Sequence, residues 1–259
     1  MVIDSCAFLG HYPFRKTSNQ SAKELVQLMD QKGIDKAVVS SIQGVYYRDM
    51  MDGNLELFEE IAPYSDRLIP AANINPEYPC AMDDLEQCVL EFGCKEIRLW
   101  PKQTKGDVCN EAYQSIMRRC AQLNVPVAFC IEDVRGRHPL DITAVLSPFD
   151  VEKVAGLIPE VDIVIHNPTY YGYVELLEKV ERTGKVYYGL GKLEAIYNSS
   201  LLTTVNNAGF DRVLFDTCSP LQYVEPQYVK LWTLKEKLNA SDADMDKIYC
   251  KNAQNLYKI

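Results

Sequence analysis

Short apolar segments alternate with amphipathic segments along the whole sequence, and this alternation constrains the fold more than any other feature. The apolar segments are strand-sized and continuous, as expected for parallel strands that are buried on both faces. The amphipathic segments carry helix signals: Ser21 with Glu24 is a capping-box pattern, and Gly33 follows the same segment as a stop signal. The eight predicted strands are 2–8, 35–41, 68–74, 96–100, 126–131, 162–166, 186–190 and 212–215.

Helices are expected between and after these strands. They are 21–32, 55–62, 82–92, 113–123, 151–157, a segment around 174–180, a segment ending near 205, then 228–238 and 245–257. Eight such units without a flexible linker predict one α/β domain over 1–259, a single (β/α)₈ TIM barrel with parallel strands. The alternative is an open doubly wound sheet, but no Gly-x-Gly-x-x-Gly follows any predicted strand.

Composition excludes several classes of protein. The hydrophobic share of 47% is enough for a large core, and the net charge of −9 argues against nucleic acid as a partner. No apolar run is long enough to cross a membrane, and the N-terminus lacks the pattern of a secretory signal. The nine cysteines are scattered without a Cys-x-x-Cys pair, which favours a reducing cytoplasm. The expected partner is a small-molecule ligand, and a homo-oligomer is compatible with the sequence.

The rare imidazoles fall where a barrel places its active site. Catalytic residues of such barrels lie at the C-terminal ends of the strands and in the loops that follow them. His11 follows the first predicted strand, His138 lies in the loop after the fifth, and His166 ends the sixth. We expect all three to open onto one pocket. His166 is the first candidate for general acid–base catalysis, with His11, His138 and Asp133 as further candidates.

Cationic and aromatic side chains lie at the same predicted end of the barrel. Arg15 belongs to the first loop, Arg135 to the fifth, and Arg98 to the fourth strand, so these three are candidate clamps for an anionic substrate. Trp100 ends the fourth strand and is a candidate wall of the pocket. A buried Arg98 requires a carboxylate, and we expect this partner to come from the mouth of the barrel, for example Asp133 or Asp216.

Several motifs, in order along the chain, resemble the amidohydrolase-related superfamily. The closest branch contains metal-dependent decarboxylases and hydrolases. The opening Ile-Asp-Ser-Cys-Ala-Phe-Leu-Gly resembles the Ile-Asp-x-His-x-His-x-Gly of that family. The further matching segments are 96–101, 125–130, 162–167, 212–220 and 251–257.

The metal-ligand positions implied by this resemblance are mostly changed. The histidine pair of the first strand falls on Cys6 and Phe8, the histidine of the fifth strand on Cys130, and the aspartate of the eighth strand on Cys218. Only the histidine of the sixth strand is kept, as His166. One interpretation is therefore a zinc site formed by Cys6, Cys130 and Cys218 with His166, because zinc accepts thiolate and imidazole ligands.

The other interpretation is a barrel without a metal. Residues 11–15 and 132–139 resemble a branch of the superfamily in which the metal ligands are replaced, and this resemblance covers more residues than the cysteines do. We therefore favour no cofactor, with zinc as the alternative, and expect Phe8 and its apolar neighbours to keep the three thiols apart. The implied function is a hydrolase or decarboxylase of a small, anionic molecule. A pseudoenzyme that binds a ligand or has a regulatory role is the competing hypothesis.

Overall fold

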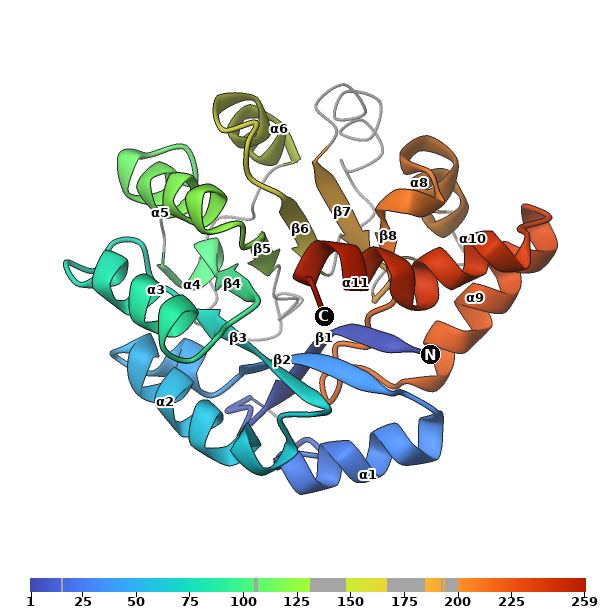
Figure 1. The fold of residues 1–259 in the computed structure, drawn as a ribbon, viewed down its shortest axis with the longest axis horizontal. Helices are drawn as coiled ribbons and strands as arrows, with labels where there is room; N and C mark the ends of the chain where they lie inside the picture. Colours follow the sequence, from blue (N-terminus) through green and yellow to red (C-terminus); the bar gives the residue numbers. More distant parts are fainter. Residues whose placement is uncertain (15, 105–106, 131–147, 167–184, 192, 194–199) are drawn as a thin grey trace.

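Eight parallel strands form a ring surrounded by helices in the computed structural model, which describes residues 1–14, 16–104, 107–130, 148–166, 185–191, 193 and 200–259 (Figure 1). Each strand pairs with the next in sequence order, from β1 to β8. The ring closes where Ala7 of β1 pairs with Ser219, just after β8. This confirms the single (β/α)₈ barrel. The strands are β1 (Ile3–Leu9), β2 (Lys36–Ser41), β3 (Leu68–Asn73), β4 (Glu96–Leu99), β5 (Val127–Cys130), β6 (Ile163–His166), β7 (Val186–Gly189) and β8 (Val213–Leu214).

The helices follow the strands in the predicted order. They are α1 (Ala22–Lys32), α2 (Met50–Ile61), α3 (Ala81–Leu90), α4 (Pro101–Thr104), α5 (Glu111–Leu123), α6 (Pro148–Leu157), α8 (Ser200–Ala208), α9 (Glu225–Lys237), α10 (Asp242–Asp246) and α11 (Asn252–Tyr257). Short helical turns in the described residues are η1 (Gly44–Tyr46), η2 (Ala62–Tyr64), η3 (Phe210–Arg212) and the π-helical η4 (Lys247–Lys251). The predicted helix around 174–180 lies outside the described residues.

Local capping explains where individual helices begin. Ser21 and Glu24 form the predicted capping box at α1, and Gly33 ends this helix with a left-handed φ of 68°. Helix α2 begins at Met50, five residues before the predicted start, because the Asp49 side chain accepts a hydrogen bond from the main-chain N–H of Met51. Within the described part of the chain, no helix is long and apolar enough to span a membrane.

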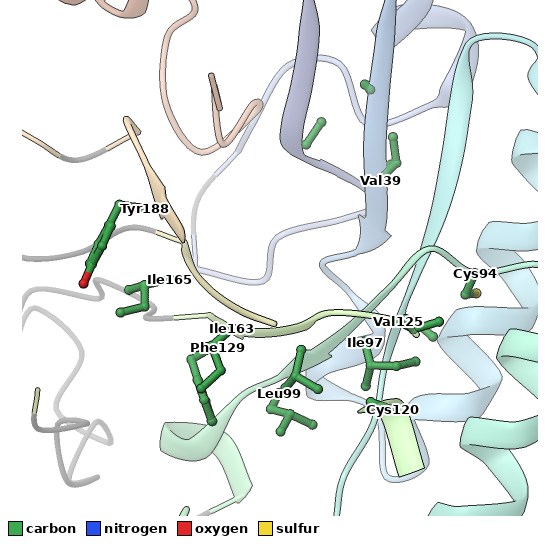
Figure 2. Close-up of a cluster of buried hydrophobic side chains, with 14 of the residues drawn as sticks. Val39, Cys94, Ile97, Leu99, Cys120, Val125, Phe129, Ile163, Ile165 and Tyr188 are labelled. Carbon is green, nitrogen blue, oxygen red and sulfur yellow. The ribbon is translucent and has the colours of Figure 1, made fainter. Parts of the chain in front are cut away.

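The core has an outer and an inner part. In the outer part, alternate strand residues face the surrounding helices; Figure 2 shows Leu99, Phe129 and Ile163 within this layer. The inner part fills the barrel itself. At the N-terminal end of the strands it is apolar and is closed by α11, which crosses the centre of the ring in Figure 1 and contributes Tyr257. At the C-terminal end it contains Phe8 and three buried cysteines. Charged side chains lie between these two apolar layers.

Candidate active site

His166, the last residue of β6, lies inside the barrel between two carboxylates. Its Nε2 is 3.2 Å from Oε1 of Glu96, and its Nδ1 is 3.3 Å from Oδ2 of Asp216. Burial alone would lower the pKa of His166, but the negative charges of Cys6 and Glu96 and a hydrogen bond with Asp216 raise this pKa well above its ordinary value. The ring is therefore an imidazolium that donates a hydrogen bond from each nitrogen.

Arg98 lies deeper in the barrel and is paired with Glu96. The Arg98 Nε donates to Oε1 of Glu96 at 2.7 Å, and neither side chain is exposed to solvent. Tyr257 of α11 donates its hydroxyl hydrogen to Oε2 of Glu96 at 2.7 Å. Burial alone would raise the pKa of Glu96, but the positive charges of His166 and Arg98 lower it to about 2. Glu96 is thus the carboxylate that joins both buried cations.

The environment of Arg98 changes the role expected for it. Its burial and its pairing with a carboxylate follow the expectation, but among the described residues the partner is Glu96 from its own strand and not Asp216. Asp133, the other expected partner, lies outside the described residues. All five N–H groups of the guanidinium bind protein acceptors. These acceptors are the Glu96 carboxylate, the Ser40 hydroxyl and the main-chain carbonyls of Ser5, Ala7 and Val38. No donor remains to hold a substrate, so this geometry argues against Arg98 as an anion clamp.

Asp216 is held in place by the loop after β7. Its Oδ1 accepts a hydrogen bond from the main-chain N–H of Gly191, while its Oδ2 faces His166. The carboxylate passes so close to Gly189 that a Cβ atom added at this residue would lie 1.9 Å from Oδ2. Position 189 therefore requires glycine because the Asp216 carboxylate occupies the space of a side chain.

Two cysteines lie beside this carboxylate. Cys6, Asp216 and Cys218 are the one group of three potential metal ligands found among the described residues, with ligand atoms all within 4.8 Å of one another. Cys130 is not part of this group. The expectation of three separate thiols is therefore wrong for Cys6 and Cys218, and the predicted trio of cysteines is replaced by two cysteines and an aspartate. The reason is the closure of the ring, which places β1 directly beside the end of β8.

Asp4 fixes the backbone that carries both cysteines. One of its carboxylate oxygens accepts hydrogen bonds from the main-chain N–H groups of Cys6, at 3.1 Å, and Thr217, at 2.9 Å. The other accepts the Thr217 hydroxyl hydrogen at 2.6 Å. Cys218 itself has a left-handed φ of 52°, which costs a non-glycine residue on the order of 1–3 kcal/mol and is common at functional sites. The β1–β8 junction therefore presents the two sulfurs in a defined arrangement.

The three cysteines of the barrel interior differ in character. Burial alone would raise the pKa of Cys6, but a hydrogen bond with Cys218 and the charges of His166 and Arg98 lower it to about 6. Burial and the neighbouring Cys6 raise the pKa of Cys218 well above its ordinary value. Burial likewise raises the pKa of Cys130 to about 12. At neutral pH, Cys6 is thus a thiolate that accepts a hydrogen bond from the Cys218 thiol, and Cys130 is a neutral core residue.

Aromatic rings cover this group from the side of the strand C-termini. Phe8 packs against Trp100 with a centroid distance of 5.9 Å, and both are buried. The Trp100 Nε1 donates to Asn73 at 2.8 Å, so the indole is held in a fixed orientation. Phe14 makes edge contacts with Tyr12 and Tyr46 and is 40% exposed. Trp100 thus packs inside this end of the barrel, and Phe14 lies at the outer rim; a role of Trp100 in substrate binding stays a prediction.

The remaining predicted site residues divide into two sets. His11 follows β1 and is exposed, with its main-chain N–H bound to Oε1 of Gln43 at 2.9 Å, whereas His166 is completely buried. The two imidazoles therefore lie at the same end of the barrel without both opening to solvent. The other predicted residues, Arg15, Asp133, Arg135 and His138, lie outside the described residues.

Glu96, Asp4 and Tyr257 were not among the predicted site residues. Glu96 had a signal in the sequence, because a residue two positions before Arg98 on a strand points to the same face. Asp4 likewise lies in the opening motif of the first strand. Tyr257 had no such signal, since its contact depends on how the last helix packs across the barrel.

The comparisons with known proteins agree with this architecture. A family model described as amidohydrolase matches residues 17–259. A Staphylococcus aureus protein assigned to the amidohydrolases superimposes with a TM-score of 0.77 at 17% identity, covering 100% of this chain and 99% of the other. No curated protein matches the chain.

Two solved enzymes have the same fold. A 4-oxalomesaconate hydratase from Rhodopseudomonas palustris gives a TM-score of 0.71 at 17% identity, covering 100% of this chain and 96% of its own. A dihydroxybenzoic acid decarboxylase from Polaromonas sp. JS666, with bound manganese and the inhibitor 2-nitroresorcinol, gives 0.69 at 17% identity and covers 99% and 96%. The family model spans nearly the whole barrel, including every residue described above from β2 onward. The chain therefore belongs to the amidohydrolase family.

Proposed function

We propose that this protein is a hydrolase or decarboxylase of a small carboxylic acid, with its reaction centre at Cys6, His166, Asp216 and Cys218. The observation that carries the proposal is the position of His166. It ends β6, contacts Asp216 at the end of β8, and lies beside Cys6 of β1. In this fold, catalytic groups come from the C-terminal ends of several strands. Membership of the amidohydrolase family supports the reaction class.

The buried charges indicate what the centre still requires. The Cys6 thiolate and the carboxylates of Glu96 and Asp216 face the two cations Arg98 and His166, so the group carries an excess of negative charge. An anionic substrate needs additional positive charge beside this group. A divalent cation would supply it, as would Arg15 and Arg135 of the sequence.

A zinc ion fits the donor atoms better than a harder cation. Cys6, Asp216 and Cys218 offer two sulfurs and one oxygen, a set that suits Zn²⁺, whereas Mn²⁺ prefers oxygen ligands. These three residues would hold the ion, which supplies Lewis-acid polarisation of a substrate oxygen when bound. The geometry does not support the expectation of a barrel without a metal. The manganese bound to the Polaromonas decarboxylase supports a divalent cation in this chain as well.

The protein side chains then have separate tasks. His166 holds a proton between Glu96 and Asp216, and it would give this proton to a leaving group or a carbanion by releasing its contact with Asp216, the longer of the two. Trp100 and Phe8 exclude water from the inner face of the site. Arg98 keeps Glu96 ionised, so that Glu96 in turn keeps His166 protonated.

The test is turnover of a panel of hydroxybenzoates and small dicarboxylic acids by protein dialysed against Zn²⁺, followed by ultraviolet absorbance and CO₂ release. His166→Gln should lower the turnover of any substrate found by about 100-fold or more, the contribution of a general acid. Cys120→Ala, which changes a buried thiol on α5 away from the centre, should retain turnover. Unchanged turnover in folded His166→Gln would contradict the assignment.

A pseudoenzyme is the second candidate, and one observation favours it. Cys6, His166, Asp216 and Cys218 are all completely buried, and their hydrogen bonds are made with one another and with the surrounding barrel. Such a group would act as a polar core that stabilises a ligand-binding barrel. Binding of a carboxylic acid to zinc-loaded protein, with no turnover across the whole panel, would favour this candidate.

A further inference from the structure

The β1–β8 junction brings two thiols together across the seam where the barrel closes. The main-chain N–H of Cys218 donates to the carbonyl oxygen of Cys6 at 2.7 Å, so the two residues are direct neighbours on adjacent chain segments. Ala7 and Ser219, the next residues along, are paired as well. The two sulfurs lie within 4.8 Å of each other, and neither cysteine is part of a disulfide bond.

This arrangement meets the main requirement of a disulfide. The Cα atoms of bonded cysteines are about 4.4–6.8 Å apart, and neighbouring strands are about 4.7–4.9 Å apart. Both side chains point into the barrel interior, where they belong to the same buried cluster. The main-chain hydrogen bond between the two residues and the short separation of their sulfurs thus place the pair close to the geometry that a disulfide needs.

We propose that Cys6 and Cys218 are an oxidative modification site, at which a peroxide joins β1 to the segment after β8 through a disulfide. In the first step one sulfur attacks the peroxide: an S–O bond forms, the O–O bond breaks, and water leaves. In the second step the other sulfur attacks this sulfenic acid: the S–S bond forms, the S–O bond breaks, and a second water leaves. Two thiols are oxidised and one hydrogen peroxide is reduced to two water molecules.

The modification would change the centre without dismantling the barrel. The disulfide removes two of the three clustered donor atoms and leaves Asp216 as the remaining one. Oxidised protein should therefore be unable to hold a soft cation there, whichever reaction the site performs. The proposal is independent of the proposed function, since it needs only the two sulfurs and an oxidant.

Peptide mapping of the intact protein tests the proposal. The full chain is dialysed against EDTA, treated with a modest excess of hydrogen peroxide, alkylated under denaturing conditions and digested with trypsin. Trypsin places Cys6 in peptide 1–15 and Cys218 in peptide 213–230, each with a single cysteine. We expect these two peptides to be linked, two of the nine thiols to be lost, and the mass to fall by about 2 Da, the two hydrogens removed. Dithiothreitol should reverse all three changes.

Matched variants separate this pair from the other thiols. Cys218→Ser should prevent the linkage, and Cys6 should then be found as its sulfenic or sulfinic acid. Cys120→Ala, which also removes a buried cysteine, should still form the linked peptides. Because both sulfurs are completely buried, glutathione disulfide, which is larger than hydrogen peroxide, should link them more slowly than peroxide does.

Two results would overturn the proposal. One is wild-type protein that retains all nine thiols after peroxide treatment while Cys6 and Cys218 are intact in the peptide map. The other is oxidation that links different cysteines, such as the neighbouring Cys88 and Cys94, or that carries Cys6 to a sulfonic acid with Cys218 still reduced.

Discussion

Replacing Arg98 by methionine should destabilise the barrel severely. The substitution keeps much of the side-chain volume but removes the charge that faces Glu96 at 2.7 Å, where neither group is exposed. It also leaves three main-chain carbonyls without the donors they now have. Breaking a buried ion pair by removing one partner costs about 3–5 kcal/mol. Because whole domains are stable by about 5–15 kcal/mol, the loss would be a large part of the total.

Urea denaturation followed by circular dichroism measures this loss as a difference in the free energy of unfolding. The matched control is Arg118→Met, because Arg118 and Glu111 are 2.9 Å apart on the surface, with 48% and 77% of their side chains exposed. Exposed pairs contribute about 0–1 kcal/mol. An Arg98→Met protein that loses no more stability than Arg118→Met would refute the conclusion that Arg98 is a structural cation of the barrel interior.

Three further substitutions test other parts of the centre. The pKa of Glu96 is lowered from 4.5 to about 2, so its contribution to the free energy of unfolding is present above pH 4.5 and is lost as the pH falls toward 2. When stability is measured as a function of acid pH, the wild-type protein should lose about 3 kcal/mol over this range, and Glu96→Gln should not show this loss. Gly189→Ala should lower the free energy of unfolding by about 3 kcal/mol or more in urea denaturation, because the new Cβ would displace Asp216. The control is Gly156→Ala in α6, where a Cβ meets no atom within 4 Å, and it should raise the free energy of unfolding by about 0.5–1 kcal/mol. Lys230→Met should cost about 1–3 kcal/mol by the same assay, since the buried ammonium donates to two main-chain carbonyls and one side-chain amide. Equal stability of variant and wild type would contradict each of the last two predictions, and an unchanged acid slope in Glu96→Gln would contradict the first.

The fold followed from the sequence because it depends on local signals that repeat. Strand-length apolar segments and helices alternate eight times, which predicts a parallel α/β fold, and the absence of Gly-x-Gly-x-x-Gly after any strand favoured the barrel over an open sheet. The predicted ends of helices were less accurate where a capping side chain lies outside the apolar periodic pattern. Asp49 is an example, because it caps α2 and makes this helix begin earlier than expected.

The pairing of side chains inside the barrel did not follow in the same way. Strand order places Cys6 and Cys218 on neighbouring elements. Their sulfurs are close because the segment after β8 runs beside β1 where the ring closes. The partner of Arg98 was sought in the mouth because a clamp was expected there. The guanidinium instead points into the barrel interior, toward Glu96 and the carbonyls of β1 and β2. The pairing of these side chains depends on the stagger of the strands and on the packing of α11, and no local sequence pattern encodes either of them.

Zinc content tests the central claim about the centre most directly. Wild-type protein is saturated with Zn²⁺, freed of excess metal by gel filtration and analysed for zinc, alongside Cys6→Ala, Cys218→Ala and the control Cys130→Ala. The group formed by Cys6, Asp216 and Cys218 predicts about one zinc ion per chain in wild type and in Cys130→Ala, and loss of zinc in the other two variants. Folded wild-type protein without zinc, or Cys130→Ala that loses zinc as the others do, would contradict it.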